Sequence, residues 1–357
     1  MQGIEPAIKE RAMETATFDT STDRPQKSVG VTTMKAIVQD TYGSVDVLQL
    51  RDVATPTIGE HDVLVLVRAA AVNPADWAIM GGLPYIARPA PMYGLRTPKN
   101  PVRGTDVAGR VEAVGSAVTR FRPGDEVFGW CRGAFAEYAA ASEDGLAIKP
   151  ADLTFEQAAA IPMAGSVALQ ALRDHGQVQA GQKVLINGAS GGIGTFAVQI
   201  AKSLGAEVTG VCGTSNVEMV RSIGADHVID YTIDDFTQSG ERYDFILDNI
   251  SNLSLSDLRR ALTPTGMLVP NGGQFQHRWL SSAGRLIKAM VSFRFVSQRL
   301  GRFVVAQRHD DLLALIALIE GGKVMPVIDR TYPLSETAAA MDYVGTGHAR
   351  GKVVISV

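Results

Sequence analysis

The feature that most constrains the fold of this chain is a glycine-rich loop within residues 184–206. Residues 184–186 form a short apolar run, typical of a buried parallel strand, and four glycines follow between positions 188 and 194. Apolar residues then recur at helical spacing from 196 to 204. A strand, glycine loop and helix in this order hold the pyrophosphate of a dinucleotide, because the backbone can approach the phosphates at the helix N-terminus. The alternative is a glycine-rich turn in another kind of α/β protein.

Composition and charge narrow the classes of partner. The chain has 357 residues, 46% hydrophobic and 20% charged, which is ordinary for a globular protein of about two domains. Its net charge of −3 does not favour nucleic acid or an anionic membrane as the main partner. No apolar run reaches the roughly 18 residues of a membrane-spanning helix, and a signal peptide's apolar core is not evident. With only Cys131 and Cys212, a disulfide framework is excluded and a reducing, cytoplasmic location is expected.

The pattern of the chain changes twice. Residues 1–33 are polar and poor in aromatics, so a disordered extension is expected. From residue 34 to about 150, short apolar runs alternate with Gly and Pro turns, which predicts a mostly β barrel-like domain with a strand at 133–138. Strands and helices alternate after that, which predicts a doubly wound parallel sheet and an α/β fold. The loop at 81–101 is rich in Pro, Gly and Tyr, and its length suggests a functional role.

Capping residues mark several predicted helix starts. Thr154 and Gln157 form a capping-box pattern, and Asp310 and Ser335 are expected to cap two later helices.

Residues 276–308 carry seven basic side chains and no acidic one. This stretch fits a helix and an edge strand used for subunit contact, or a basic and apolar surface that meets membrane and lipophilic substrate.

Several motifs together resemble one family. They are Gly-Thr-Asp-Val-Ala-Gly-Arg-Val at 104–111, Phe-Arg-Pro-Gly-Asp at 121–125, Gly-Ala-Phe-Ala-Glu-Tyr at 133–138, the glycine loop, and His-Ala-Arg-Gly-Lys at 348–352. In this order they resemble medium-chain dehydrogenase/reductases, in particular the zinc-free quinone oxidoreductase group. The resemblance implies a GroES-like domain at 34–158, a Rossmann NADP-binding domain at 159–304 and a return to the first domain at 305–357. It also implies a homodimer, for which residues 293–305 could supply the contact.

The expected metal positions do not hold metal ligands. The resemblance places the zinc-binding cysteine and histidine of related dehydrogenases at Asn73 and Thr105, and neither an amide nor a hydroxyl is a usual zinc ligand. The six histidines show no metal-like clustering. We therefore expect no zinc, which disfavours simple alcohol oxidation because no Lewis acid would lower the pKa of the alcohol.

The second strand of the predicted dinucleotide fold favours NADPH, with NADH as the alternative. Its tip at 212–216 carries no acid, whereas NAD sites usually place one there to bind the ribose 2′-hydroxyl. Hydroxyl, amide and cationic groups would instead bind a 2′-phosphate. The resemblance implies that Tyr231 and Arg350 also approach that phosphate. The expected cofactor contacts are Ser190, Gly191, Gly192, Ile193, Ser215, Asn216, Arg221, Tyr231, Asn249, Ile250, Gly272, Gly273, Arg350 and Lys352.

Candidate catalytic residues come from the resemblance. It implies that Asn73, Tyr85 and Ser166 lie near the nicotinamide or the substrate, although Asn73 could equally cap the turn before Pro74. Trp77, Trp130 and Phe135 are candidates for an apolar substrate pocket, and core packing is the alternative for the last two. This chain departs from the family at Val167, where threonine is common, and at Ala78, where quinone reductases carry tyrosine.

These residues predict a zinc-independent, NADPH-dependent reductase of a small molecule, either a quinone or an α,β-unsaturated carbonyl compound. One alternative is a zinc-free alcohol or ketone oxidoreductase of secondary metabolism. A second alternative, from another class, is a non-catalytic NADPH-binding or RNA-binding protein, supported only by the basic stretch at 276–308.

Overall fold

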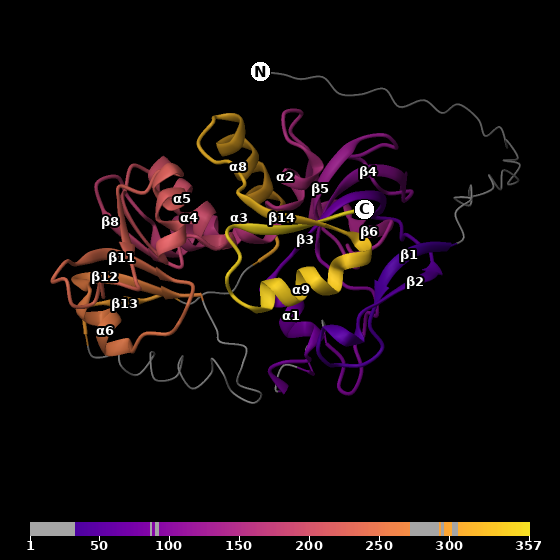
Figure 1. Ribbon diagram of the computed structural model, residues 1–357. Helices are drawn as coiled ribbons and strands as arrows, with labels where there is room; N and C mark the ends of the chain where they lie inside the picture. Colours follow the sequence, from indigo (N-terminus) through magenta and orange to yellow (C-terminus); the bar gives the residue numbers. More distant parts are fainter. Residues whose placement is uncertain (1–32, 86–87, 90–92, 272–292, 294–295, 302–305) are drawn as a thin grey trace, which may run out of the picture. The chain divides into compact units, whose positions relative to one another are not determined.

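The computed structural model describes residues 33–85, 88–89, 93–271, 293, 296–301 and 306–357 (Figure 1). All but the last residue of the expected extension at 1–33 lies outside these ranges, as does most of the basic stretch at 276–308.

The second part of the chain forms a six-stranded parallel sheet. Its strands are β8 (Lys183–Asn187), β9 (Glu207–Cys212), β10 (His227–Asp230), β11 (Tyr243–Asp248), β12 (Leu262–Pro270) and β13 (Arg299–Leu300). Their order is β10-β9-β8-β11-β12-β13, and every pair is parallel. The order reverses beside β8, which is the doubly wound arrangement that binds dinucleotides at the strand ends. The predicted fold class is confirmed.

Helices cover both faces of this sheet because alternate residues of each buried strand point to opposite sides. Val184 and Ile186 of β8 pack with Phe196 of α4 (Gly192–Ser203), whereas Leu185 packs with Leu258 of α6 (Leu255–Arg260). Figure 1 shows α6 on the other side of the sheet from α4 and α5 (Val217–Ser222).

The first part of the chain supplies most of a seven-stranded sheet. Its strands are β3 (Asp62–Val72), β4 (Asp106–Val114), β5 (Glu126–Trp130), β6 (Tyr138–Ser142), β7 (Leu146–Ile148), β14 (Ile328–Pro333) and β15 (Lys352–Ser356). The order is β14-β15-β3-β4-β5-β7, with β6 also paired to β3. A separate pair joins β1 (Thr33–Val38) to β2 (Gln49–Ala54). Because β15 lies antiparallel to β3, the last strand brings Lys352 to the end of β3.

The predicted strand at 133–138 is wrong in its position, because β6 begins only at Tyr138. Gly133 has a φ of +80°, which ends any extended run there. Phe135 N donates to Arg103 O and Ile37 N donates to Phe135 O, so this segment bonds to β1 on one side and to the residues before β4 on the other.

The remaining helices are α1 (Pro74–Met80), α2 (Phe155–Ala159), α3 (Pro162–Leu169), α8 (His309–Glu320) and α9 (Thr337–Gly345). A π-helix, Gln170–Gly176, continues α3, and short 3-10 turns lie at Val45–Val47, Glu143–Gly145, Thr214–Asn216 and Leu334–Glu336. The Thr154–Gln157 capping box is confirmed, with both reciprocal hydrogen bonds present.

The predicted caps of the last two helices are wrong. Arg308 and Glu336 occupy the N-cap positions of α8 and α9, so Asp310 lies within α8 and Ser335 precedes the α9 cap. Asp310 is exposed, and it is the next residue, Asp311, that is fully buried.

Asp311 ties α8 to the π-helix. Its carboxylate accepts hydrogen bonds from Arg173 (2.6 Å), Gln170 (2.6 Å) and Arg308 (3.0 Å). A buried carboxylate with this many charged partners is costly to remove, because the surrounding donors lose their acceptor.

We expect Asp311→Ala to lower the free energy of unfolding by about 3 kcal/mol, the usual cost of breaking a buried ion pair. Chemical denaturation followed by circular dichroism measures the change. Asp310→Ala is the matched control: it removes an exposed acid from the same turn, so it should shift stability by no more than about 0.5 kcal/mol. Equal losses in the two variants would contradict the assigned role of Asp311.

Candidate functional site

The site is built where β3 ends and α1 begins. Asn73 precedes Pro74, and the backbone N–H of Asn73 donates to the Asp76 carboxylate at 2.9 Å. Proline suits the first position of a helix because that position needs no N–H donor. Asp76 is 1% exposed, and burial raises its pKa to about 6 against the hydrogen bond from Asn73, which lowers it. The turn therefore carries a carboxyl group that titrates near neutral pH.

The side chain of Asn73 is held at both ends. Its Oδ1 accepts a hydrogen bond from Lys352 Nζ at 2.5 Å, and its Nδ2 donates to Asp106 Oδ2 at 3.0 Å. Lys352 Nζ also donates to Val72 O at 3.2 Å and lies 3.6 Å from Asp106 Oδ2. Asp106 Oδ2 accepts a further bond from Met163 N at 3.3 Å, which joins the cluster to the start of α3.

Burial sets the electrostatics of this cluster. It lowers the pKa of Lys352 and raises that of Asp106, and the attraction between these two groups opposes both shifts. Arg103 and Asp76 are also buried. Burial is the largest cause of the lowered pKa of Arg103 and of the raised pKa of Asp76, and the attraction between these two groups opposes both shifts. Burial also raises the pKa of Cys131, so its thiol stays protonated and is not a reactive thiolate.

The glycine loop has the conformation that its sequence predicts. Gly188 has a φ of +78°, and a Cβ on Gly194 would lie only 2.1 Å from Gly188 O. Thr195 N donates to Gly191 O at 2.9 Å, so α4 begins directly after the loop. The first N–H groups of a helix lack partners within the helix and face outward. Gly192 and Ile193 begin α4 and could offer such groups to a pyrophosphate, whereas the N–H of Gly191, the N-cap residue, already donates to Gly188 O at 3.2 Å.

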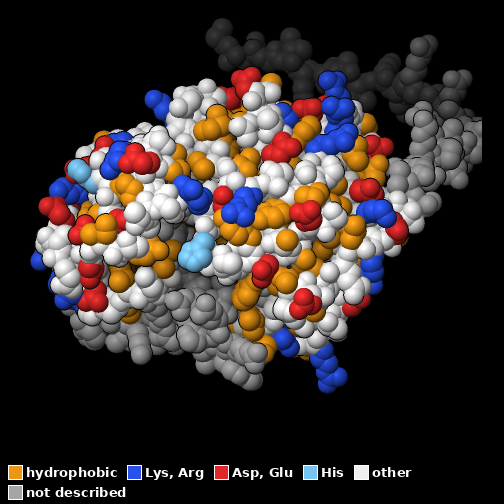
Figure 2. Space-filling view, in the orientation of Figure 1, with side chains coloured by type: hydrophobic (Ala, Val, Ile, Leu, Met, Phe, Trp, Pro, Cys, Tyr) orange, Lys and Arg blue, Asp and Glu red, His pale blue; other side chains and the backbone are white. Residues whose placement is uncertain are grey.

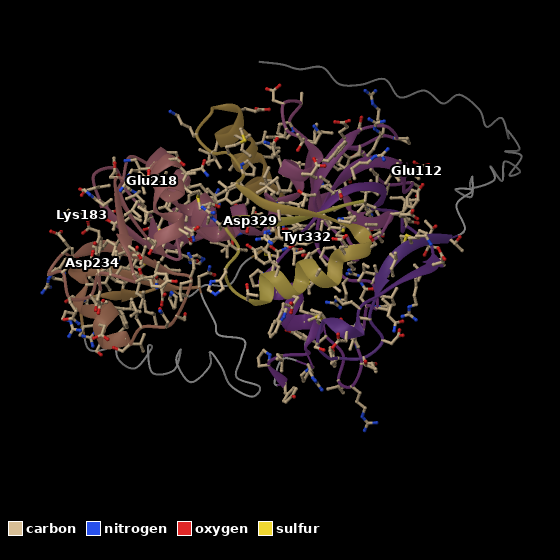
Figure 3. All side chains as sticks on the ribbon, in the orientation of Figure 1. Glu112, Lys183, Glu218, Asp234, Asp329 and Tyr332 are labelled. Atoms are coloured by element: carbon tan, nitrogen blue, oxygen red, sulfur yellow. The ribbon has the colours of Figure 1, made fainter. Side chains whose placement is uncertain are left out.

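The tip after β9 contains no acid and is held in place by Arg350. The Arg350 guanidinium donates to Ser215 O at 2.9 Å, and Arg350 N donates to the Asp329 carboxylate at 2.8 Å; Figure 3 shows Asp329 on β14. Tyr231 is 62% exposed, and its hydroxyl would lie 3.3 Å from a Cβ on Gly213.

Two other expected cofactor contacts near the tip, Asn216 and Arg221, have partners in different parts of the structure. Asn216 Nδ2 donates to Ser190 Oγ at 3.3 Å, which joins the tip to the glycine loop. Arg221 instead pairs with Glu218 on α5, the residue labelled in Figure 3, and both side chains are largely exposed. The structure therefore gives Arg221 a partner on its own helix, while Arg350 is directed to the tip.

The next strand ends bring Asn249 and Ile250 to the same edge of the sheet. Asn249 Oδ1 accepts a hydrogen bond from Asn271 at 2.7 Å, and a Cβ on Gly188 would lie 2.7 Å from Ile250 Cδ1. Gly272 and Gly273 lie outside the described residues.

The aromatic residues expected over the pocket lie in several environments. Arg88 lies 4.5 Å from the ring centres of both Tyr42 and Tyr85, which organises the beginning of the loop at 81–101. Trp77 packs near Gly345 of α9, where a Cβ would lie 2.7 Å from its Nε1. Phe135 is fully buried in the core of the first domain, which favours its packing role.

Three buried polar atoms near α3 have no hydrogen-bond partner: Asp106 Oδ1, Trp130 Nε1 and Ser166 Oγ. Asp106 and Trp130 are direct partners across β4 and β5, and Ser166 follows Met163 by one helical turn. Buried polar groups rarely stay unpaired, so a polar ligand group or an ordered water is expected beside them.

Comparison with known proteins places the chain in a family. Residues 59–151 match the alcohol dehydrogenase GroES-like domain, and residues 223–355 match the zinc-binding dehydrogenase family. The mitochondrial NAD(P)H oxidoreductase RTN4IP1 of Mus musculus is 34% identical over 91% of this chain and 90% of its own length. The chloroplastic NADPH-dependent alkenal/one oxidoreductase of Arabidopsis thaliana is 34% identical over 90% and 79%. The solved quinone oxidoreductase from Coxiella burnetii is 31% identical, with a TM-score of 0.78 over 91% and 99%.

The chain belongs to the medium-chain dehydrogenase/reductase superfamily. Its relatives and its fold place it in the quinone oxidoreductase-like branch, as the sequence motifs predict.

The donor groups of this superfamily member do not fit a zinc ion. The Asn73 carbonyl oxygen is occupied by Lys352, and its amide nitrogen by Asp106. Across the described ranges, no group of three or more His, Cys, Asp or Glu side chains could hold a metal ion.

In the same ranges, no helix is long and apolar enough to cross a membrane. On the face shown in Figure 2, the described acidic and basic side chains are interspersed.

Sequence reasoning did not identify Asp106 as a site residue, nor did it predict the burial of Asp76. A signal for each was present: Asp76 stands three residues after Asn73, as in a capping box, and Asp106 directly follows Thr105 in the glycine-bounded motif. Lys352 is expected to bind cofactor, and the structure places its ammonium at 2.5 Å from Asn73 Oδ1.

We expect Asp76→Asn to change how stability depends on pH. The pKa of Asp76 is raised from 3.8 to about 6 by burial, with Asp106 acting in the same direction and Arg103 and Lys352 opposing it. The stability that this group contributes is therefore present below pH 3.8 and is lost as the pH rises to about 6. Relative to Asp76→Asn, the native protein should lose up to about 3 kcal/mol between these pH values.

Denaturant unfolding at a series of pH values from 4 to about 7 measures this difference. Asp310→Asn, which changes an exposed acid, should run parallel to the native protein. Parallel curves for Asp76→Asn would contradict the raised pKa.

Proposed function

We propose that this protein is a zinc-independent, NADPH-dependent reductase that transfers hydride to a quinone or an α,β-unsaturated carbonyl compound. The observation that carries the proposal is the Asn73–Lys352–Asp106 cluster, because the Asn73 amide at the expected metal position already bonds Lys352 through its oxygen and Asp106 through its nitrogen. The names of the relatives, which include an NADPH-dependent alkenal/one oxidoreductase, support the same reaction class.

The chemistry suits a site without a metal. NADPH, when bound, supplies the hydride. A quinone or enone spreads the incoming charge over a conjugated system that ends at its carbonyl oxygen, so it needs less electrophilic help than an isolated carbonyl. The role of the protein is then to orient the two reactants and exclude water. We propose Asn73, Tyr85 and Ser166 as the residues around the reacting groups, with Trp77 and Trp130 beside the substrate.

The described residues fit a bound dinucleotide. The glycine loop offers helix N-terminal N–H groups to the pyrophosphate, and Ser166 Oγ is a buried group without a partner. At the tip of β9, Arg350, Ser215 and Tyr231 offer a cation and hydroxyl groups to a 2′-phosphate, and residues 213–216 themselves carry no carboxylate. We therefore propose NADPH as the preferred cofactor.

Two further properties belong to the proposal. The buried, free state of Cys131 and Cys212 supports a reducing, cytoplasmic location, although the relatives named above are mitochondrial and chloroplastic. The edge of the parallel sheet at β13 supports a homodimer formed through that edge. Cell fractionation and sedimentation of the purified protein test these two statements.

The direct test is a screen of quinones, enones, saturated ketones and alcohols with NADPH and NADH in parallel, with metal analysis of the same sample. We expect oxidation of NADPH by a quinone or enone, unchanged after treatment with a chelator. Oxidation of alcohols without reduction of any conjugated acceptor would contradict the proposal, and so would NADPH binding without turnover on any acceptor.

We expect Arg350→Ala to raise the Kd for NADPH by about 10- to 100-fold, because one charge-assisted contact to the 2′-phosphate is lost. The Kd for NADH should change much less, and titration of NADPH and NADH fluorescence measures both. Arg110→Ala removes an exposed arginine from β4, which pairs with Glu126, and should leave both values unchanged. An equal rise in the Kd for NADPH and for NADH would show that Arg350 does not bind the 2′-phosphate.

A further inference from the structure

The side chain of Lys352 connects the glycine loop to the end of β3. A Cβ placed on Gly192 would lie 3.0 Å from Lys352 Cδ, so the aliphatic stem lies against the first turn of α4. The ammonium then reaches Asn73 Oδ1 at 2.5 Å and Val72 O at 3.2 Å. One side chain therefore touches both the loop that would hold the pyrophosphate and the amide that would lie near the reacting groups.

The main chain fixes the point from which this side chain starts. Gly351 N donates to Ser190 O at 2.8 Å, and Gly351 forms an isolated parallel bridge with Gly191. Gly351 has a φ of +93°, and a Cβ there would lie 2.3 Å from Val327 O, so only glycine fits. The beginning of β15 is thus bonded directly to the glycine loop.

The contacts of Asn73 define one orientation of its amide. Lys352 is a pure donor and Asp106 is an acceptor when ionised, so a flipped amide would set donor against donor and acceptor against acceptor. Asn73 and Lys352 are each 3% exposed and Asp106 is fully buried, so water cannot easily replace a lost partner. The orientation of the amide therefore depends on both neighbours.

The ammonium of Lys352 bonds to the end of β3. Two of its three N–H groups donate to Asn73 Oδ1 and Val72 O, and the carboxylate of Asp106 lies 3.6 Å away as an ion-pair partner. Both hydrogen bonds hold the end of β3, so this side chain can act on the reaction through the Asn73 amide.

We infer that Lys352 is a positioning residue for hydride transfer, which holds the Asn73 amide in one orientation next to the glycine loop. This inference rests on the proposed reductase function and goes beyond it. It also replaces the expectation that Lys352 binds the cofactor directly. Asn73 is then the residue through which Lys352 acts on the reaction.

The test is Lys352→Met, which keeps most of the stem against Gly192 but removes the donor and the charge. The amide of Asn73 is then free to rotate. We expect kcat for the acceptor to fall by about 100-fold, the usual effect of a small misplacement of reacting groups. The Kd for NADPH should change by less than about threefold, because no cofactor contact is removed.

Lys149→Met is the matched control. Lys149 is also a buried lysine: its Nζ donates to Pro150 O at 3.0 Å and Leu153 O at 2.7 Å, and lies 3.2 Å from Glu126. Its removal should lower the melting temperature as Lys352→Met does, while kcat and the Kd for NADPH stay unchanged. The control separates a loss of stability from a loss of positioning.

Two results would overturn the inference. A rise of more than about tenfold in the Kd for NADPH with an unchanged kcat would make Lys352 a direct cofactor ligand. A fall in melting temperature with both kcat and Kd unchanged would make its role purely structural.

A readout that needs no turnover separates this inference from the proposed function. If the native protein reduces no acceptor, the fluorescence emission of bound NADPH still reports the surroundings of its nicotinamide ring. We expect Lys352→Met to bind NADPH with a similar Kd but to alter that emission, whereas Lys149→Met leaves it unchanged. Identical emission from all three proteins would overturn the inference independently of the reaction.

Discussion

The buried contact between Lys352 and the pair Asn73 and Asp106 is the interaction on which the site depends. Taking an ammonium and a carboxylate out of water is costly, and the structure offsets part of this cost with two hydrogen bonds to Lys352 Nζ and two to Asp106 Oδ2. The contact joins the last strand to the end of β3 across 279 positions of the chain. The return of β15 to the first sheet is therefore also what completes the site.

This arrangement relates the fold to the proposed chemistry. In the proposed function, the glycine loop and the tip of β9 would recognise the parts of a dinucleotide that do not react, while the residues at the end of β3 surround the part of the site where reaction is proposed. Since the Asn73 amide is saturated by its neighbours, it is better suited to shape and orient than to bind a cation. A conjugated acceptor, whose own π-system carries the developing charge, fits such a site better than a simple alcohol does.

Much of the fold followed from local patterns, but the centre of the site did not. The strand, loop and helix around residues 184–206 were predictable because their periodicity and glycines are local, and so was the Thr154–Gln157 capping box. The strand expected at 133–138 was wrong because Gly133 has a positive φ and Phe135 bonds to β1 and to Arg103, and these non-local contacts override local β propensity. The Lys352–Asn73 contact has no local signal, since it exists only when distant strands pair.

The most direct test of this account is a double-mutant cycle on the free energy of unfolding with Lys352→Met and Asp106→Asn. If the charges of Lys352 and Asp106 compensate each other in the interior, each single substitution leaves the other group buried without its partner. The double variant should then lose less free energy of unfolding than the sum of the two single variants. The account predicts a coupling energy of about 1 to 3 kcal/mol between the two sites. Effects that add within about 0.5 kcal/mol would contradict it, because they would mean that the two groups do not interact in the folded protein.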